Sequence, residues 1–208
     1  MPPKRRGFDR STGLRRYRKI FLIATEGTKT EPRYFSMLNN QQSVVKVSCL
    51  RGNHETSPPQ VLRRMEKHLR QESLKESDEA WLVADKDNWN DEQLRQLYEW
   101  SQQKENHGFA LSNPSFEYWL LLHFEEGDGI ITARECTSRL LRYWPEYNKD
   151  FDPWKITGDM IATAIQRARR RDNPPCTDWP RNPGGTTAYR LVSNILNSLV
   201  GSVGVSIQ

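Results

Sequence analysis

The stretch Lys19-Ile20-Phe21-Leu22-Ile23-Ala24-Thr25-Glu26-Gly27 decides the fold that we expect for this chain. Its run of apolar residues, mostly branched or aromatic, predicts a strand that is buried on both faces, as in a parallel sheet. The run ends on Glu26, where the strand gives way to a loop that opens with glycine. Because ligands of open α/β sheets bind at the carboxyl ends of the strands, Glu26 is a candidate site residue.

A second apolar run, Glu79-Ala80-Trp81-Leu82-Val83-Ala84-Asp85-Lys86-Asp87, also ends in acid. Side chains alternate along a strand, so Asp85 and Asp87 are expected on one side and Lys86 on the other. Crowded carboxylates repel one another unless a cation is present, and a ligand set made of oxygen atoms suits Mg²⁺ or Mn²⁺. Together with Glu26, these two aspartates predict a divalent-cation site.

Each acid also has a purely structural interpretation. A single acid at the end of a strand is commonly a solvated loop residue or a helix cap. Glu117 is a fourth candidate metal ligand, because it lies one turn into a segment that is otherwise almost entirely apolar. Its alternative role is that of a buried acid paired with an arginine or with a tryptophan indole. The sequence leaves these alternatives open.

The segments around the two strands alternate between helix and strand patterns. Helices are predicted at 28–38, from 57 to about 69, from 90 to about 100 and at 113–124, and further strands at 43–50 and 108–111. Capping residues mark the helix starts, and they are the box Thr28–Glu31, the run Ser57–Gln60, Asn90, and Asn113 before Pro114. This order predicts an α/β fold, with a Rossmann-like core at residues 19–126 and a mostly parallel four-stranded sheet.

The second half of the chain has a different pattern. Beyond Gly127-Asp128-Gly129 the strand signal fades, and helices are predicted at about 132–143, 157–170 and 186–200. Between the last two lies a loop rich in proline and glycine, residues 172–185, which is long for a compact domain and is expected to be functional or mobile. Residues 127–208 are therefore predicted to form a helical C-terminal subdomain.

The positive charge is concentrated at the start of the chain. The net charge is +5, and residues 1–19 hold eight of the 31 basic residues but only one of the 26 acidic ones. We expect residues 1–18 to form a flexible basic arm on a nearly neutral body, which favours a nucleic-acid partner because basic residues on phosphates release counterions. The candidate contacts in this arm are Lys4, Arg5, Arg6, Arg15 and Arg16. A solvated tail without a partner is the alternative.

Several classes of protein are disfavoured by the sequence. With 36% apolar residues and no membrane-spanning stretch, the chain is expected to be a soluble, cytoplasmic protein that does not bind a membrane. The three cysteines lack CxxC spacing and the four histidines lack HxxxH spacing, which argues against zinc. Gly27 and Lys29 do not form a Walker motif or a dinucleotide fingerprint, and the segment from Asp85 onward departs from a calcium-binding loop.

Four segments resemble a known family. A strand that ends in Glu-Gly and a later strand that ends in Asp-x-Asp are similar to the signature of TOPRIM folds, found in topoisomerases, primases and OLD-type nucleases. More narrowly, the chain resembles the RloB-like family. The segments that carry this resemblance are Glu26 to Phe35, the pair Asp85 and Asp87, Ser112 to Phe124, and Asn182 to Thr187.

This resemblance implies a TOPRIM-like core and a metal-dependent nuclease of prokaryotic anti-phage defence, which acts on RNA, tRNA included, or on DNA. In the implied mechanism Asp85 and Asp87 hold Mg²⁺, which polarises the scissile phosphate. Glu26 is either the general base or a ligand of a second metal ion. Lys29 or Arg33 contacts a phosphate oxygen, or both are solvated.

The resemblance also implies partners. Members of the family are often encoded beside an ATPase, so an ATPase is the expected protein partner, and the sequence leaves a homo-oligomer open. Two other functions remain possible from the sequence. One is a non-catalytic, TOPRIM-derived module that binds nucleic acid or a partner, and the other is a nucleotidyl or phosphoryl transferase that uses the same acids.

Overall fold

A computed structural model of the chain describes residues 19–203 apart from 40–44, 51, 53–56, 88, 150 and 153–154. The predicted basic arm, with its candidate contacts at Lys4, Arg5, Arg6, Arg15 and Arg16, lies outside the described residues. In the part of the chain that is described, no helix has both the length and the apolar character needed to cross a membrane.

The described strands form one mixed sheet. Its strands lie in the order β2-β1-β3-β4-β5, and the first four of these are parallel while β5 runs antiparallel to β4. The strands are β1 (Lys19–Thr25), β2 (Val45–Leu50), β3 (Glu79–Asp85), β4 (His107–Asn113) and β5 (Gly185–Thr186). The prediction of an α/β fold with a mostly parallel sheet is confirmed. The short β5, which the sequence did not predict, comes from the end of the proline- and glycine-rich loop.

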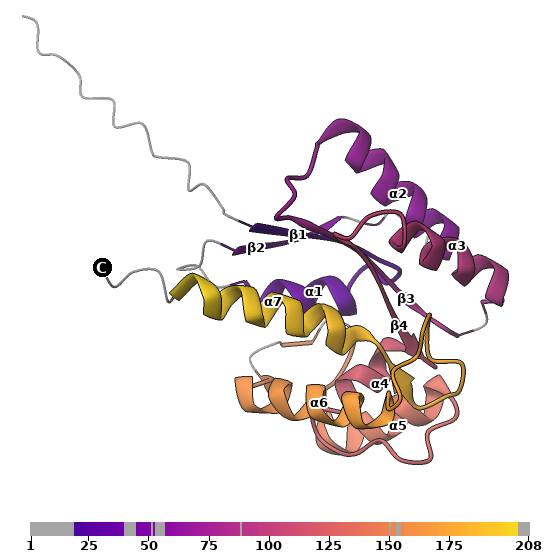
Figure 1. Cartoon of the computed structure of the whole chain (residues 1–208). Helices are drawn as coiled ribbons and strands as arrows, with labels where there is room; N and C mark the ends of the chain where they lie inside the picture. Colours follow the sequence, from indigo (N-terminus) through magenta and orange to yellow (C-terminus); the bar gives the residue numbers. More distant parts are fainter. Residues whose placement is uncertain are drawn as a thin grey trace, which may run out of the picture.

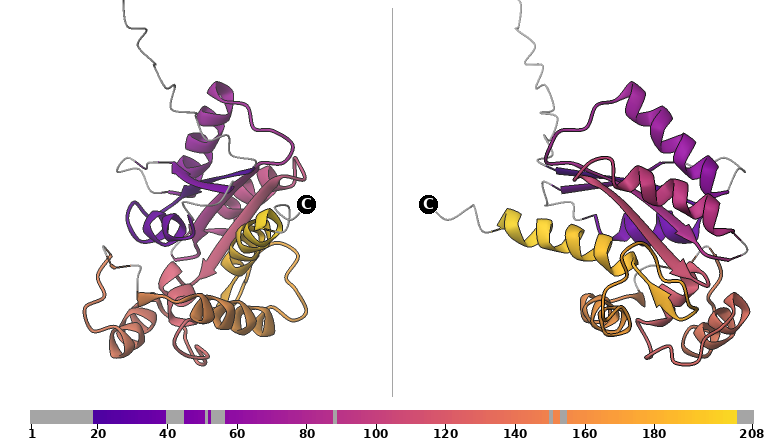
Figure 2. Two further views of the ribbon diagram at one scale, coloured as in Figure 1. Left: turned by 90° about the vertical axis from the view of Figure 1, so that its left-hand side faces the viewer. Right: turned by 45° about the vertical axis from the view of Figure 1, so that its right-hand side comes forward.

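Helices cover both faces of the sheet. Helices α2 and α3 pack on one face of the sheet, and α1 and α7 pack on the other (Figures 1 and 2). The remaining three helices, α4, α5 and α6, lie beyond the end of the sheet, on the same side as α1 and α7. The helices are α1 (Thr30–Met37), α2 (Pro58–Gln71), α3 (Asp91–Ser101), α4 (Phe116–Leu121), α5 (Ala133–Tyr143), α6 (Gly158–Arg171) and α7 (Ala188–Val203). This arrangement is that of a doubly wound α/β fold.

The strand prediction holds because both sets of alternating side chains are buried. In β1, Phe21 and Ile23 point into the core beneath α1 and α7, whereas Leu22 and Ala24 point into the core beneath α2 and α3. All four side chains are at most 2% exposed. A strand that is apolar on both faces is stable only between two helical layers, and the sequence of β1 therefore determines the layered fold.

Three of the predicted helix starts are confirmed in detail. The pairs Ser57 with Gln60, Asn90 with Gln93, and Thr132 with Glu135 each form a capping box. These reciprocal hydrogen bonds satisfy backbone N–H groups that the first turn of a helix leaves without partners.

The predicted cap at Asn113 is wrong. Asn113 is the last residue of β4, and its side chain donates hydrogen bonds to the carbonyl oxygens of Pro180 (3.0 Å) and Arg181 (3.2 Å). The helix begins three residues later, at Phe116, and α4 ends at Leu121. The segment between β4 and α4 is thus a turn that is tied to the proline- and glycine-rich loop.

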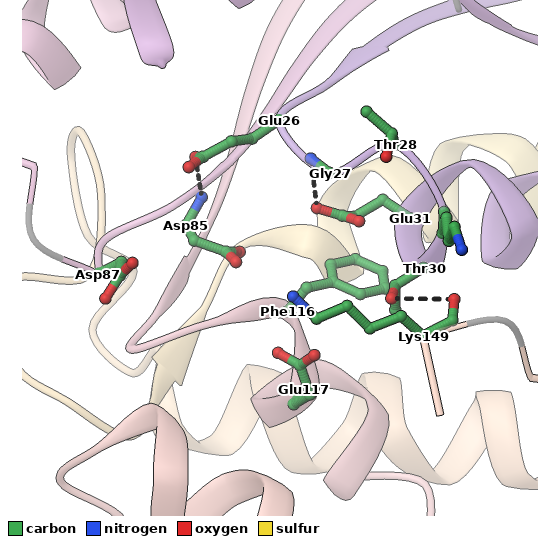
Figure 3. A pocket seen from close by; sticks show the side chains of 11 residues that line it. Glu26, Gly27, Thr28, Thr30, Glu31, Asp85, Asp87, Phe116, Glu117 and Lys149 are labelled. Carbon is green, nitrogen blue, oxygen red and sulfur yellow. Dashed lines mark hydrogen bonds between the residues drawn. The ribbon is translucent and has the colours of Figure 1, made fainter. Parts of the chain in front are cut away.

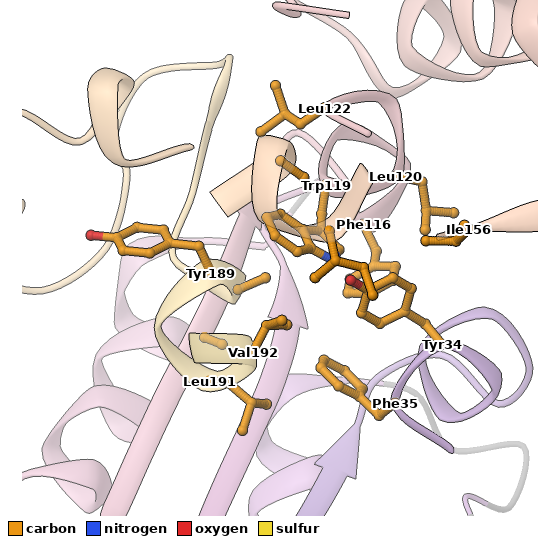
Figure 4. Close-up of a cluster of buried hydrophobic side chains, with 14 of the residues drawn as sticks. Tyr34, Phe35, Phe116, Trp119, Leu120, Leu122, Ile156, Tyr189, Leu191 and Val192 are labelled. Carbon is orange, nitrogen blue, oxygen red and sulfur yellow. The ribbon is translucent and has the colours of Figure 1, made fainter. Parts of the chain in front are cut away.

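The second half of the chain shares its core with the first. Tyr34 and Phe35 of α1, Trp119 of α4, and Leu191 and Val192 of α7 lie in one buried cluster (Figure 4). Helix α7 lies against the sheet, in contact with β2 and β4. The predicted boundary between residues 126 and 127 therefore does not divide the hydrophobic packing, although α5 and α6 do lie beyond the end of the sheet.

Candidate acidic active site

The connections of the sheet create a crevice between β1 and β3. From β1 the chain passes through α1 to β2 on one side, whereas β3 lies on the other side of β1 and leads on to β4. In doubly wound sheets, ligands bind at such a point of reversal, at the carboxyl ends of the strands. A pocket of about 420 Å³ lies there, and it is lined by five carboxylates, those of Glu26, Glu31, Asp85, Asp87 and Glu117 (Figure 3).

Glu26 follows directly after β1 and is held by two hydrogen bonds. Its Oε2 accepts a bond from the backbone N–H of Asp85 (3.1 Å), and its Oε1 accepts one from the indole Nε1–H of Trp89 (2.7 Å). Burial raises the pKa of Glu26 to about 7, against the lowering effect of these two bonds. The charges of Glu31 and Asp87 raise it further.

Asp85 ends β3 and points into the pocket (Figure 3). Although the residue as a whole is half-buried, its Oδ1 atom is buried and accepts no hydrogen bond from the described residues. Burial raises the pKa of the Asp85 carboxyl well above its usual value, and the charges of Glu31, Glu26 and Glu117 raise it further. A buried acceptor without a donor costs stability, so the fold tolerates Asp85 rather than requiring it.

Asp87 lies in the pocket lining, but the prediction that Asp87 follows the alternation of β3 is wrong. The strand ends at Asp85, and Asp87 is exposed with a φ of 29°, in the left-handed region. Its backbone N–H donates to the carbonyl of Pro114 (2.9 Å). The turn, rather than the pleat of the strand, decides where the Asp87 carboxylate lies.

Glu31 is a pocket residue that the sequence did not predict. The sequence predicts a capping box between Thr28 and Glu31, and this prediction is wrong. Helix α1 begins at Thr30, and Glu31 Oε1 accepts a hydrogen bond from the backbone N–H of Gly27 (2.9 Å). Glu31 is only 4% exposed, and a Cβ atom at position 27 would lie 2.0 Å from its Oε2. The available signal was an acid on the same helix face as Tyr34 and Phe35, which are both buried.

Glu117 and Lys149 complete the pocket on the side across from Glu26 (Figure 3). The Ser115 hydroxyl donates to Glu117 Oε2 (2.7 Å), and the Tyr147 hydroxyl donates to Glu117 Oε1 (3.1 Å). Neither predicted alternative partner of Glu117, an arginine or a tryptophan indole, is among these donors. Lys149 brings a positive charge to the acidic lining, and it lowers the pKa of Glu31 against the larger raising effect of burial.

The two predicted phosphate contacts lie in different places. Lys29 is exposed, occupies the N-cap position of α1 and lines the pocket. Arg33 is exposed one turn further along α1 and is not among the residues that line the pocket.

The pocket is acidic, but its carboxylates do not converge on one point. Among the described residues, no group of three or more histidine, cysteine, aspartate or glutamate side chains is placed so that it could hold a metal ion. The donor set nevertheless fits a hard cation chemically, because it consists of carboxylate oxygens and includes the unpartnered Oδ1 of Asp85. Bringing Glu26 toward Asp85 Oδ1 would require a new side-chain position, since Trp89 and the Asp85 N–H hold it.

Fold and pocket together define a class of protein, namely a doubly wound α/β protein with a carboxylate-lined pocket at the reversal point of its sheet. Residues 21–195 match the family model described as RloB-like protein, and the chain belongs to this family. The match includes the acidic pocket residues and the proline- and glycine-rich loop. No curated protein and no solved structure matches the chain.

Proposed function

We propose that this protein is a TOPRIM-type nuclease that depends on Mg²⁺ or Mn²⁺ and acts on RNA, tRNA included, or on DNA in prokaryotic anti-phage defence. The observation that carries the proposal is the buried, unpartnered Oδ1 of Asp85 in a pocket lined by five carboxylates. Neighbouring acids in the pocket raise one another's pKa, which means that their negative charges repel and destabilise the protein. A bound cation would remove this repulsion. The substrate class and the role in defence rest on the family resemblance.

The residues of the pocket have separate proposed roles in binding the cation and in transferring a proton. Asp85 would hold the cation, together with Asp87 and Glu31 from the same pocket lining. When bound, Mg²⁺ or Mn²⁺ supplies the charge that polarises the phosphodiester and stabilises the leaving oxygen. Glu26 takes the proton of the attacking water or serves as a further ligand, depending on whether it leaves Trp89.

Two further groups act from the rim and the wall of the pocket. Lys29, at the exposed start of α1, can place its ammonium group on a phosphate oxygen of the substrate. Glu117 is fixed by Ser115 and Tyr147, so it would support the residues that hold the cation without moving.

The test is a cleavage assay with the purified full chain. The substrates are tRNA, single-stranded RNA, single-stranded DNA and duplex DNA, each with Mg²⁺, with Mn²⁺ or with chelator. We expect cleavage of at least one substrate that needs the cation and is lost in Asp85→Asn. The matched control is Glu99→Gln, an exposed acid on α3 away from the pocket, which should cleave at the wild-type rate.

The hydrogen bonds of Glu26 favour a second candidate function, a module that binds nucleic acid without cleaving it. Both carboxylate oxygens of Glu26 are engaged, and the described residues offer no ready set of ligands. In such a module the wild type and Asp85→Asn would bind nucleic acid equally well in chelator, and neither would cleave it with any cation.

We further propose that the protein works in the cytoplasm with an ATPase partner, a proposal that rests on the family resemblance. Co-expression with the product of a neighbouring ATPase gene, followed by size-exclusion chromatography, tests for the complex. The elution volume of the chain alone tests for a homo-oligomer. Separate elution of the two proteins, with strong toxicity of the chain alone, would argue against restraint by an ATPase.

A further inference from the structure

A second cavity, of about 330 Å³, lies in the proline- and glycine-rich loop. The loop is anchored at two points. Trp179 is 1% exposed and packs against Tyr98 and Phe109 in the core beneath α2 and α3. At the other end, β5 pairs with β4, and the backbone N–H of Gly184 donates to the carbonyl of Asn113 (2.9 Å). The cavity therefore has walls that are fixed by the core and by the sheet.

Two arginines line this cavity, and both are held in place before any ligand arrives. The Arg171 Nε–H donates to the carbonyl of Glu126 (3.0 Å), and its Nη2 pairs with Asp128. The Arg181 guanidinium lies 3.9 Å from the centre of the Trp179 ring. These contacts fix the direction of each guanidinium, which reduces the entropy that binding an anion would cost.

Both arginines keep donors for a ligand. Arg181 donates from Nη1 to Asp91 (2.6 Å) and from Nη2 to Asp178, which leaves its Nε–H without an acceptor among the described residues. Arg171 likewise has its Nη1 free of acceptors in that part of the chain. The side chains of Asp128 and Asp91 are 82% and 51% exposed, so these ion pairs are weak and a phosphate can compete with them.

The cavity and the acidic pocket are linked by hydrogen bonds through the turn after β4. Asp87 of the pocket lining bonds through its backbone N–H to Pro114, the neighbour of Asn113. The side chain of Asn113 donates to the carbonyls of Pro180 and Arg181, which both line the cavity. The paired ends of β3 and β4 therefore place the two sites next to each other, as neighbouring subsites for one strand require.

We propose that the cavity between Arg171 and Arg181 binds a backbone phosphate of the nucleic-acid strand that enters the acidic pocket. The proposal rests on the proposed function, because it assigns a neighbouring subsite of the same substrate. Planar guanidinium groups bind phosphate oxygens through paired hydrogen bonds. The exposed amide of Asn182, whose side chain has no hydrogen bond to the described residues, adds a neutral donor at the rim.

The test measures strand binding in chelator, so that it does not depend on cleavage. The probes are fluorescently labelled single-stranded RNA, single-stranded DNA and duplex DNA of one length, and affinity is measured against salt concentration. We expect Arg181→Gln and Arg171→Gln each to weaken binding of the preferred probe about tenfold. Each should also lower the slope of log affinity against log salt by about 0.7 for a single strand. Inorganic phosphate should compete only weakly if the site takes a phosphate within a strand.

The matched control is Arg170→Gln. Arg170 lies on the same turn of α6 and pairs with Glu126, with its side chain 68% exposed, but it does not line the cavity. Its affinity and salt slope should equal those of the wild type. An equal loss in Arg170→Gln and the cavity variants would mean a diffuse basic surface, and wild-type affinity in both cavity variants would likewise overturn the proposal.

A second variant covers the case in which an arginine substitution unfolds the loop. Asn182→Asp adds a negative charge to the cavity at an exposed position, and we expect it to weaken binding as much as Arg181→Gln does. Unchanged binding by a folded Asn182→Asp protein would contradict the subsite. If the cavity variants lose affinity but the wild type cleaves nothing with any cation, the proposed nuclease function fails while the subsite stands.

Discussion

Two neighbouring sites at the same end of the sheet shift the pKa values of their acids in opposite directions. In the acidic pocket the carboxylates crowd together, and burial and neighbouring acids raise the pKa of Asp85. The second site is the cavity lined by Arg171 and Arg181, here called the arginine cavity, and Asp172 also lines it. Burial would raise the pKa of Asp172, but hydrogen bonds from Cys176, Tyr189 and Arg190 lower it below its usual value. In the acidic pocket, Asp85 has a carboxylate oxygen without a hydrogen-bond donor among the described residues. In the arginine cavity, donors from the surrounding fold stabilise the charge of Asp172.

The difference separates what the fold needs from what the fold tolerates. A satisfied acid such as Asp172 stabilises the loop that carries the arginines. An unsatisfied acid such as Asp85 destabilises the protein at neutral pH, so folding alone does not explain its place at the end of β3, whereas the proposed cation would. The comparison therefore makes opposite predictions for the same isosteric substitution at the two sites.

The largest effect is expected on catalysis. Asp85→Asn should lower the cleavage rate at least about 10³-fold, which is about 4 kcal/mol of barrier, because it would remove the proposed ligand of the cation. Glu26→Gln should have an effect of the same order, whereas Asp172→Asn should retain cleavage where the protein is folded. Single-turnover cleavage of the preferred substrate measures all three. Wild-type rates in both Asp85→Asn and Glu26→Gln would exclude this active site.

The next effect is a loss of stability at the satisfied acid. Asp172→Asn should destabilise the protein by about 2 kcal/mol, because the side chain is 8% exposed and loses the charge of its hydrogen bonds with Arg190, Tyr189 and the Cys176 N–H. Since the folded-state pKa of Asp172 is lowered, this contribution is present above the unfolded pKa of about 3.8 and is lost at lower pH. Urea unfolding at pH 7 measures the change. Asp128→Asn, at an exposed ion pair, is the control and should cost less than about 0.5 kcal/mol.

A smaller effect of opposite sign is expected at the unsatisfied acid. In chelator at pH 8, Asp85→Asn should stabilise the protein by about 1 kcal/mol, because a neutral amide removes charge repulsion in the pocket. The gain from Glu26→Gln should be smaller, since an amide cannot accept from both Trp89 and the Asp85 N–H. Melting temperatures in chelator and in Mg²⁺ test this, and Mg²⁺ should stabilise the wild type but not Asp85→Asn. A clear destabilisation by Asp85→Asn in chelator would show that Asp85 is structural.

The same groups determine a dependence on pH. The folded-state pKa of Glu26 is raised from 4.5 to about 7, so the folded protein binds more protons than the unfolded chain in this interval. Stability in chelator should therefore fall as pH rises from about 4.5 to 7, and Mg²⁺ should reverse most of the fall. A rising stability over this interval in chelator would mean that the pocket acids are paired.

The sequence could predict the acids at strand ends but not their surroundings. Glu26 and Asp85 were identified because each stops an apolar run, and the end of a buried strand is a local property of the sequence. Asp87 was misplaced because the left-handed turn after Asp85 depends on a contact with Pro114, far along the chain. Glu31 was missed because its spacing from Thr28 also fits a capping box.

The arginine cavity could not be predicted from the sequence, because it also depends on contacts between distant segments. Its loop has no periodic pattern, and the insertion of Trp179 beneath α3 joins segments that are distant in sequence. The prediction of a functional or mobile loop followed from length and composition alone. Which arginines it carries into a cavity is decided by the pairing of β5 with β4.

The smallest effect on stability is expected from removal of the basic segment at residues 1–18. This segment is a third charged region, to be compared with the acidic pocket and the arginine cavity. The segment lacks a periodic apolar pattern, so its removal should change the free energy of unfolding by less than about 0.5 kcal/mol. Its seven basic residues, including Lys4, Arg5 and Arg6, should nevertheless contribute to the salt dependence of nucleic-acid binding.

Removal of residues 1–18 should therefore weaken binding to all nucleic-acid probes alike and lower the salt slope for each of them. The cavity variants, in contrast, should act through one phosphate and change the slope by about 0.7. If the segment and the arginine cavity contact different phosphates, the slope changes of the truncation and of Arg181→Gln should add in the combined variant. An unchanged slope after truncation would mean that the segment contacts no phosphates. A combined change smaller than the sum would place the segment and the arginine cavity on the same phosphate.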